Sequence, residues 1–134
     1  MNRTHLEGAA EKLTAQRGYT FYTGPEDDMG HTVRNYPAAW LAPPELHAVE
    51  GRTHGRATYD MTLHLLRPGA RISPAERRTA LAEMEAQMIE IFAELSLDER
   101  ILAIEGLSVR PRAFSLTPHG EISQTATARI VTWF

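Results

Sequence analysis

The segment from Arg56 to Leu66 constrains the fold most strongly, because its apolar and polar residues alternate strictly. The apolar positions are Ala57, Tyr59, Met61, Leu63 and Leu65, and the polar positions between them are Arg56, Thr58, Asp60, Thr62 and His64. Successive side chains of a strand point to opposite faces, so this pattern predicts a strand with one buried and one polar face. The chain must therefore build a sheet that carries a core on one side.

A long amphipathic helix is expected directly after this strand. Ser73-Pro74-Ala75-Glu76 has the form of a capping box, with proline at the first helical position. Apolar residues then recur at spacings of three and four: Leu81, Met84, Met88, Ile91 and Leu95, with Ala80, Ile89 and Phe92 widening the stripe. We expect a helix of about 22 residues that covers the sheet.

The remaining segments predict further strands and one shorter helix. Thr4-His5-Leu6-Glu7 has the form of a second capping box, and a helix is expected over residues 4–17. Strands are expected at 19–23, 36–42, 45–50, 104–116 and 121–134, the fourth bent near Pro111. Residues 24–35 are predicted to form an exposed loop, and residues 96–99 a short helical turn.

This order of elements predicts one domain over residues 1–134. Strands come in runs joined by short turns, which favours a mainly antiparallel sheet. We expect an α+β fold, a two-layer sandwich with one long and one shorter helix packed on one face of the sheet.

Composition excludes several classes of function. Fourteen basic and seventeen acidic residues give a formal net charge of −3, a poor balance for a general nucleic-acid binder. The absence of cysteine excludes disulfides, zinc–thiolate sites and thiol nucleophiles. No apolar run is long enough to span a membrane, and the charged N-terminal segment does not have the form of a signal peptide, so synthesis in the cytosol is expected.

No motif points clearly to catalysis or to a metal. His47, His54 and His64 have no ligand spacing that we can justify, and we interpret them as surface histidines. Glu26-Asp27-Asp28 resembles half of a calcium loop but lacks the alternating ligands, so a solvated loop tip is favoured. One enzymatic or small-molecule-binding alternative remains, in which Tyr59, Asp60 and His64 line a concave site.

The polar faces of the strands at 56–66 and 121–134 admit two interpretations. A long, lightly charged face rich in threonine, together with unpaired strand edges, suits an interface between subunits. An ordinary solvated face explains the same residues equally well.

The whole string of elements resembles the tail terminator, or tail-completion, proteins of long-tailed bacteriophages. The features that carry the resemblance are an opening helix followed by the aromatic stretch Gly18-Tyr-Thr-Phe-Tyr-Thr-Gly24, then Asn35-Tyr-Pro-Ala-Ala-Trp-Leu41, the alternating strand from Ala57 to Leu66, the proline-led helix from Ser73, and a final alternating strand from Ala126 to Trp133. The resemblance covers nearly the full chain and is one of element order and residue class.

The resemblance implies a structural protein of the virion tail, assembled in the host bacterial cytoplasm from a phage or prophage gene. Such proteins form a ring, typically a hexamer, on the end of the tail tube, and their free subunits can be monomers. The ring ends tube polymerisation and presents a surface for head joining. The implied partners are the tail tube protein and the head–tail connector, with no catalysis, no cofactor, no nucleic-acid specificity and no membrane. A head–tail joining or neck protein is the alternative within the same particle.

For this role we expect exposed charge beside the long strand to form the contacts between subunits or with the tube. The candidate interface residues are Arg52, Arg56, Thr58 and Asp60, together with the acidic loop residues Glu26, Asp27 and Asp28.

Overall fold

The strand predicted from alternation lies at the centre of the sheet. It is β4 (Gly55–Arg67) in the computed structural model, which describes residues 2–134. One edge of β4 pairs along its length with β6 (Ile122–Trp133). The other edge is shared, with β3 (Glu45–Gly51) beside its first half and β2 (Ala38–Leu41) beside its second half. Every other part of the fold is therefore positioned relative to β4.

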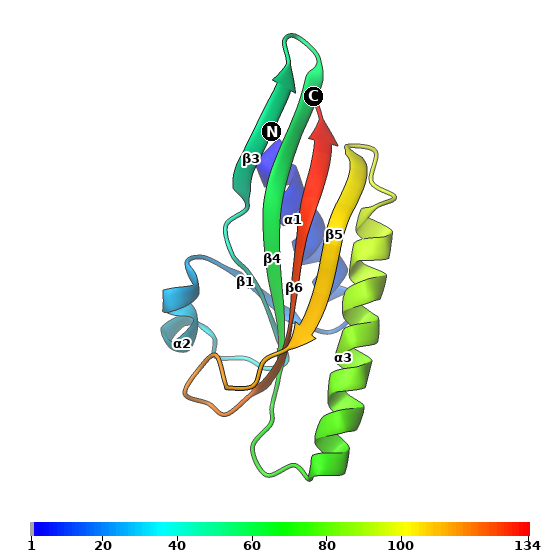
Figure 1. Ribbon diagram of the computed structural model, residues 1–134. Coiled ribbons are helices and arrows are strands. Elements are labelled where there is room, and N and C mark those ends of the chain that lie inside the picture. Colours follow the sequence, from blue (N-terminus) through cyan, green and yellow to red (C-terminus); the bar gives the residue numbers. More distant parts are fainter. Residues whose placement is uncertain (1) are drawn as a thin grey trace.

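The sheet is six-stranded, open and mostly antiparallel, as Figure 1 shows. Its order is β1-β2-β4-β6-β5, with β1 (Thr20–Thr23) at one edge and β5 (Ile101–Pro111) at the other. Only β1 and β2 pair in parallel. The predicted α+β fold and its mainly antiparallel sheet are confirmed.

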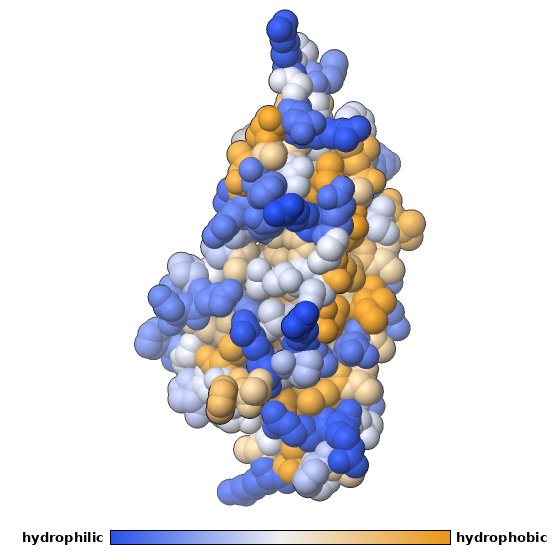
Figure 2. Space-filling view, viewed as in Figure 1, coloured by the Kyte–Doolittle hydropathy of each residue, from blue (hydrophilic) through white to orange (hydrophobic). Residues whose placement is uncertain are grey.

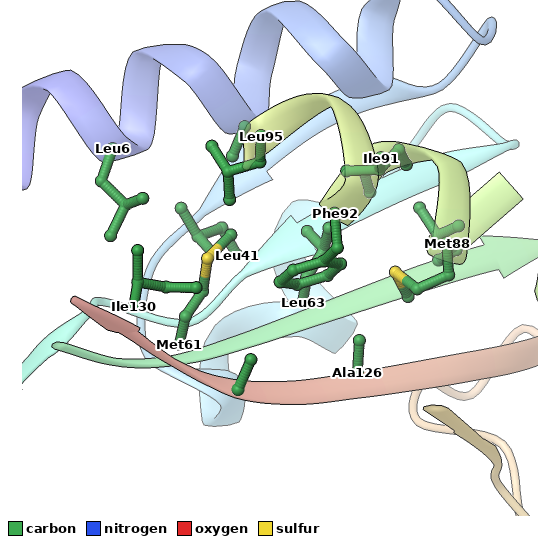
Figure 3. Packing of buried hydrophobic residues seen from close by; sticks show 14 of the residues in the cluster. Leu6, Leu41, Met61, Leu63, Met88, Ile91, Phe92, Leu95, Ala126 and Ile130 are labelled. Atoms are coloured by element: carbon green, nitrogen blue, oxygen red, sulfur yellow. The ribbon is translucent and has the colours of Figure 1, made fainter. Parts of the chain in front are cut away.

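Two helices cover one face of the sheet, which we call the inner face. They are α1 (Asn2–Ala15) and α3 (Pro74–Leu95). In Figure 3, Leu6 of α1 and Met88, Ile91, Phe92 and Leu95 of α3 point toward Leu41, Met61, Leu63, Ala126 and Ile130 of the strands. This is the main core, and the inward stripe of α3 is the stripe that its sequence predicts, apart from Ile89, which is half exposed.

The segment predicted as an exposed loop at 24–35 is instead ordered and partly buried. It contains the 3₁₀ helix η1 (Glu26–Asp28) and the short helix α2 (Met29–Thr32). Parallel strands cannot be joined by a tight turn, so β1 reaches β2 through this crossover. The crossover lies on the outer face of the sheet, opposite α1 and α3, and buries Met29 and Val33 against Trp40 and Leu66.

Two other boundaries differ clearly from the sequence prediction. The first helix already begins at Asn2, so Thr4 lies inside its first turn and does not cap it. Strand β5 ends at Pro111, where a proline cannot donate to the ladder, and residues 112–121 form a loop.

At α3 the expected cap is present, since the Ser73 hydroxyl accepts a hydrogen bond from the Glu76 backbone amide at 3.1 Å. Among residues 2–134, no helix is long and apolar enough to cross a lipid bilayer.

Replacing Phe92 by alanine tests the main core. Phe92 is buried between α3 and the sheet, so Phe92→Ala removes a large apolar side chain and leaves a cavity. We expect a loss of about 3–5 kcal/mol in the free energy of unfolding, measured by urea denaturation. The matched control is Ile89→Ala on the outer side of the same helix, for which we expect a change of about 1 kcal/mol or less. Equal losses in the two variants would contradict this packing.

Candidate interaction surfaces

The outer face of the sheet carries three of the predicted interface residues on one strand. Arg56, Thr58 and Asp60 alternate with buried residues along β4 and are at least partly exposed. The Asp60 carboxylate lies 3.4 Å from Nε of Arg129 and 3.4 Å from Nδ1 of His47, on the two neighbouring strands. These contacts are long and solvent-exposed, so they contribute little to the stability of the fold.

Beside Asp60 the outer face is hollowed by an irregularity in β5. The register of β5 against β6 shifts between Glu105 and Ser108, and Gly106 adopts a positive φ of 63°. The result is an open hollow of about 540 Å³ whose polar lining includes Asp60, Glu105 and Arg129. Its wide mouth and mixed charge make it part of an extended polar surface.

The β3 hairpin, which we define as residues 45–56, stands at the edge of the sheet. Every residue of β3 is exposed, including two large apolar side chains, Leu46 at 51% and Val49 at 55%. Glycine is required at both ends of the turn, because a Cβ on Gly55 would lie 1.9 Å from the Glu50 carbonyl oxygen and Gly51 has a φ of 110°. Arg52, one of the predicted interface residues, lies in this turn and is exposed.

A second group of exposed apolar side chains lies toward the other edge of the sheet, beside α3 and β5. We call it the α3–β5 flank, and its large apolar members are Ile89, Leu97, Leu102 and Leu107. Figure 2 shows hydrophobic side chains reaching the surface on the side of β5, whereas hydrophilic ones cover most of α2. Sequence reasoning missed this surface, because Ile89 was assigned to the buried stripe and Leu97 and Leu102 lie in no periodic pattern.

The acidic loop lies apart from the predicted interface residues Arg56, Thr58 and Asp60. One of its residues contacts a buried histidine of β4, which the sequence did not predict. Glu26, Asp27 and Asp28 are all exposed, and Glu26 also reaches β4, where its Oε1 lies 3.3 Å from Nε2 of His64. His64 is fully buried, and its Nδ1 lies 2.7 Å from the Thr125 hydroxyl. The prediction of a surface histidine is therefore wrong at this position, because the crossover covers the polar face of β4 there.

Burial dominates the protonation equilibrium of His64. Desolvation lowers the pKa of its imidazole from the usual value near 6.5, and the nearby Glu26 carboxylate opposes this shift. Arg112 adds a smaller effect in the lowering direction. The neutral form of the imidazole is thus the one that the folded chain favours.

The residues of the enzymatic alternative do not converge. Tyr59 points to the inner face, with the Arg3 guanidinium 5.9 Å from its ring centre. Asp60 lies on the outer face, and His64 is buried under Glu26, four residues further along β4 and thus about 13 Å away. Among residues 2–134, no three His, Cys, Asp or Glu side chains gather as a metal site requires, so His47, His54 and His64 stay apart.

The chain matches no protein-family model and no curated protein. The resemblance to tail terminators is thus one of element order and residue class alone.

The buried histidine should make stability depend on pH. The unfolded chain takes up a proton at His64 near pH 6.5, whereas the folded chain takes it up only at lower pH. Stability should therefore fall as pH is lowered below about 7. His64→Gln should reduce this slope in urea unfolding measured at each pH, because glutamine does not titrate.

The exposed His54 provides the control for this measurement. His54→Gln makes the same exchange at an exposed position, since that side chain lies in the solvated turn of the β3 hairpin. A wild-type slope retained in His64→Gln would show that other groups cause the pH dependence.

Proposed function

We propose that this chain is a structural subunit of a phage or prophage tail, which assembles with copies of itself into a ring of the tail-terminator type. The ring caps the tail tube, ends its polymerisation and presents a surface for head joining. Its partners are the tube protein and the head–tail connector, and the subunit works by surface complementarity without a catalytic step.

One observation carries this proposal: large apolar side chains are exposed on two separate flanks of one sheet. Leu46 and Val49 lie on the β3 hairpin, and Ile89, Leu97 and Leu102 lie on the α3–β5 flank. Exposed apolar surface is costly in water and commonly marks contact sites between proteins. A ring subunit needs two different patches, because each copy contacts one neighbour on either side.

The architecture supports the same proposal. The order of elements agrees with the resemblance, from the opening helix through the alternating strand and long helix to the final hairpin. Because α1 and α3 both lie on the inner face, the outer face offers a broad polar surface from the hollow at Asp60 to the β3 hairpin. Such a surface is suited to contact with further tail components.

Deleting the gene from a strain that produces the particles tests this function. Electron microscopy should show tails of uncontrolled length that lack heads, because nothing stops tube growth or allows joining. Supplying the intact gene in trans should restore tails of uniform length with heads attached. Normal particles from the deletion strain would refute the proposal, and tails of normal length without heads would favour the head–tail joining alternative.

A further inference from the structure

We propose that the loop of residues 112–121 is a strap, held closed over the crossover by a one-way chain of hydrogen bonds. The chain runs from His119 through Tyr36 and Thr117 to the carboxylate of Glu121, and every donor in it points toward Glu121. His119 then donates from Nδ1 in both its neutral and its protonated form, so the strap stays closed in both. This inference does not depend on the ring function proposed above.

The strap reaches the crossover across the outer face of the sheet. It joins β5 to β6, whereas the crossover joins β1 to β2, so the contact between them spans β4. Leu116 of the strap packs on the apolar cluster beneath the crossover, and Pro118 lies against Gly30 of α2. Figure 1 shows the strap, drawn in orange, beside α2. Opening of the strap would therefore uncover part of this cluster.

A buried carboxylate organises the strap from within. Glu121 is only 3% exposed, and its Oε1 accepts hydrogen bonds from the backbone amides of Leu116 and Thr117. Its Oε2 accepts a hydrogen bond from the Thr117 hydroxyl. A carboxylate that is withdrawn from water needs donors on both oxygens, because it has no proton of its own to offer. One side chain thus closes the turn that runs from residue 116 to residue 121.

The number of available protons sets the direction of the chain. Thr117 has one hydroxyl proton and donates it to Glu121, so its oxygen must accept from the Tyr36 hydroxyl, 3.0 Å away. Tyr36 has then used its own proton, and its oxygen must accept from Nδ1 of His119, 2.7 Å away. Burial raises the pKa of the Tyr36 phenol, which keeps its proton in place. His119 therefore carries a proton on Nδ1.

This direction makes the strap insensitive to the charge of His119. The neutral ring already donates from Nδ1, so a second proton enters at Nε2 and breaks no contact of the chain. Residues 68–70, which share a small hollow with His119, carry no titratable side chain. The charged or titratable groups that act on the Tyr36 phenol beside it are Glu121, Tyr22 and Arg34.

A chain of the opposite direction would behave differently. It would need a proton on the Glu121 carboxyl, and each hydroxyl would then donate toward His119. The neutral ring would accept from Tyr36 at Nδ1 and carry its proton on Nε2. Acid would place a proton on Nδ1 as well, so the contact with Tyr36 would be lost and the strap would loosen.

The tautomer of His119 tests the direction. In protein labelled with the heavy nitrogen isotope at histidine, long-range proton–nitrogen correlation NMR at about pH 8 shows which ring nitrogen carries the proton. Comparison with the spectrum of His119→Gln identifies the signals of His119. We expect the form with the proton on Nδ1. A ring protonated on Nε2, or one that exchanges freely between the two forms, would overturn the inference.

Removal of either hydroxyl tests whether the chain holds the strap closed. Tyr36→Phe and Thr117→Val each delete one link with little change in shape. We expect amide hydrogen exchange at residues 116 and 117 to become about tenfold faster in each variant, the effect of one lost hydrogen bond. The double variant should show less than the product of the two single effects, because both hydroxyls belong to one chain.

Tyr22→Phe is the matched control, because it removes a tyrosine hydroxyl that lies outside the chain. That hydroxyl accepts hydrogen bonds from the backbone amides of Arg34 and Asn35 at 3.3 and 3.2 Å. Exchange should therefore become faster at residues 34 and 35 and stay unchanged at 116 and 117. No acceleration at 116 and 117 in Tyr36→Phe, or an equal one in Tyr22→Phe, would overturn the inference.

The same exchange measurement tests the response to acid. It is made in the His64→Gln background, so that protonation of the buried His64 does not contribute. The protection of the amides at residues 116 and 117, relative to an unfolded peptide, should be the same at about pH 8 and about pH 5. A loss of protection that follows the titration of His119 would show a chain of the opposite direction and would overturn the inference.

Discussion

The antiparallel pairing of β4 with β6 is the interaction on which the rest of this structure depends. The register runs without interruption from Arg56 opposite Trp133 to Arg67 opposite Ile122. Both helices of the inner face pack on these strands, and the hairpin and the crossover both attach to the other edge of β4. The same pairing places Thr125 beside His64 and Arg129 beside Asp60, so it also sets the polar contacts of the outer face.

Local pattern was sufficient to predict the parts of the fold that depend on one periodicity. Strand β4 and helix α3 have long, regular repeats, and the Ser73 cap marks where the helix begins. The crossover at residues 24–37 could not be predicted in this way. Its two buried apolar residues, Met29 and Val33, lie among polar ones, and the parallel pairing of β1 with β2 joins segments that are distant in sequence.

The candidate surfaces also combine features that local pattern predicts with features that only the assembled fold determines. Alternation correctly places Arg56, Thr58 and Asp60 on one face of β4, but it cannot say what covers that face, and His64 is buried for this reason. Whether Leu46 or Ile89 is exposed depends on where the helical layer ends, which is a property of the assembled fold. The bulge between Leu46 and Ala48, which brings Leu46 and Val49 to the same face, leaves no signal in the sequence.

The crossover divides the sheet into two parts that differ in how many faces are packed. Near β2 and the second half of β4, side chains are buried on both faces, between α3 on one side and α2 on the other. Near the β3 hairpin, Ala57 and Tyr59 of β4 pack into the core of the inner face, whereas every residue of β3 itself is exposed. Unfolding the base of the sheet would therefore expose apolar side chains on both faces, whereas opening the hairpin would expose very few.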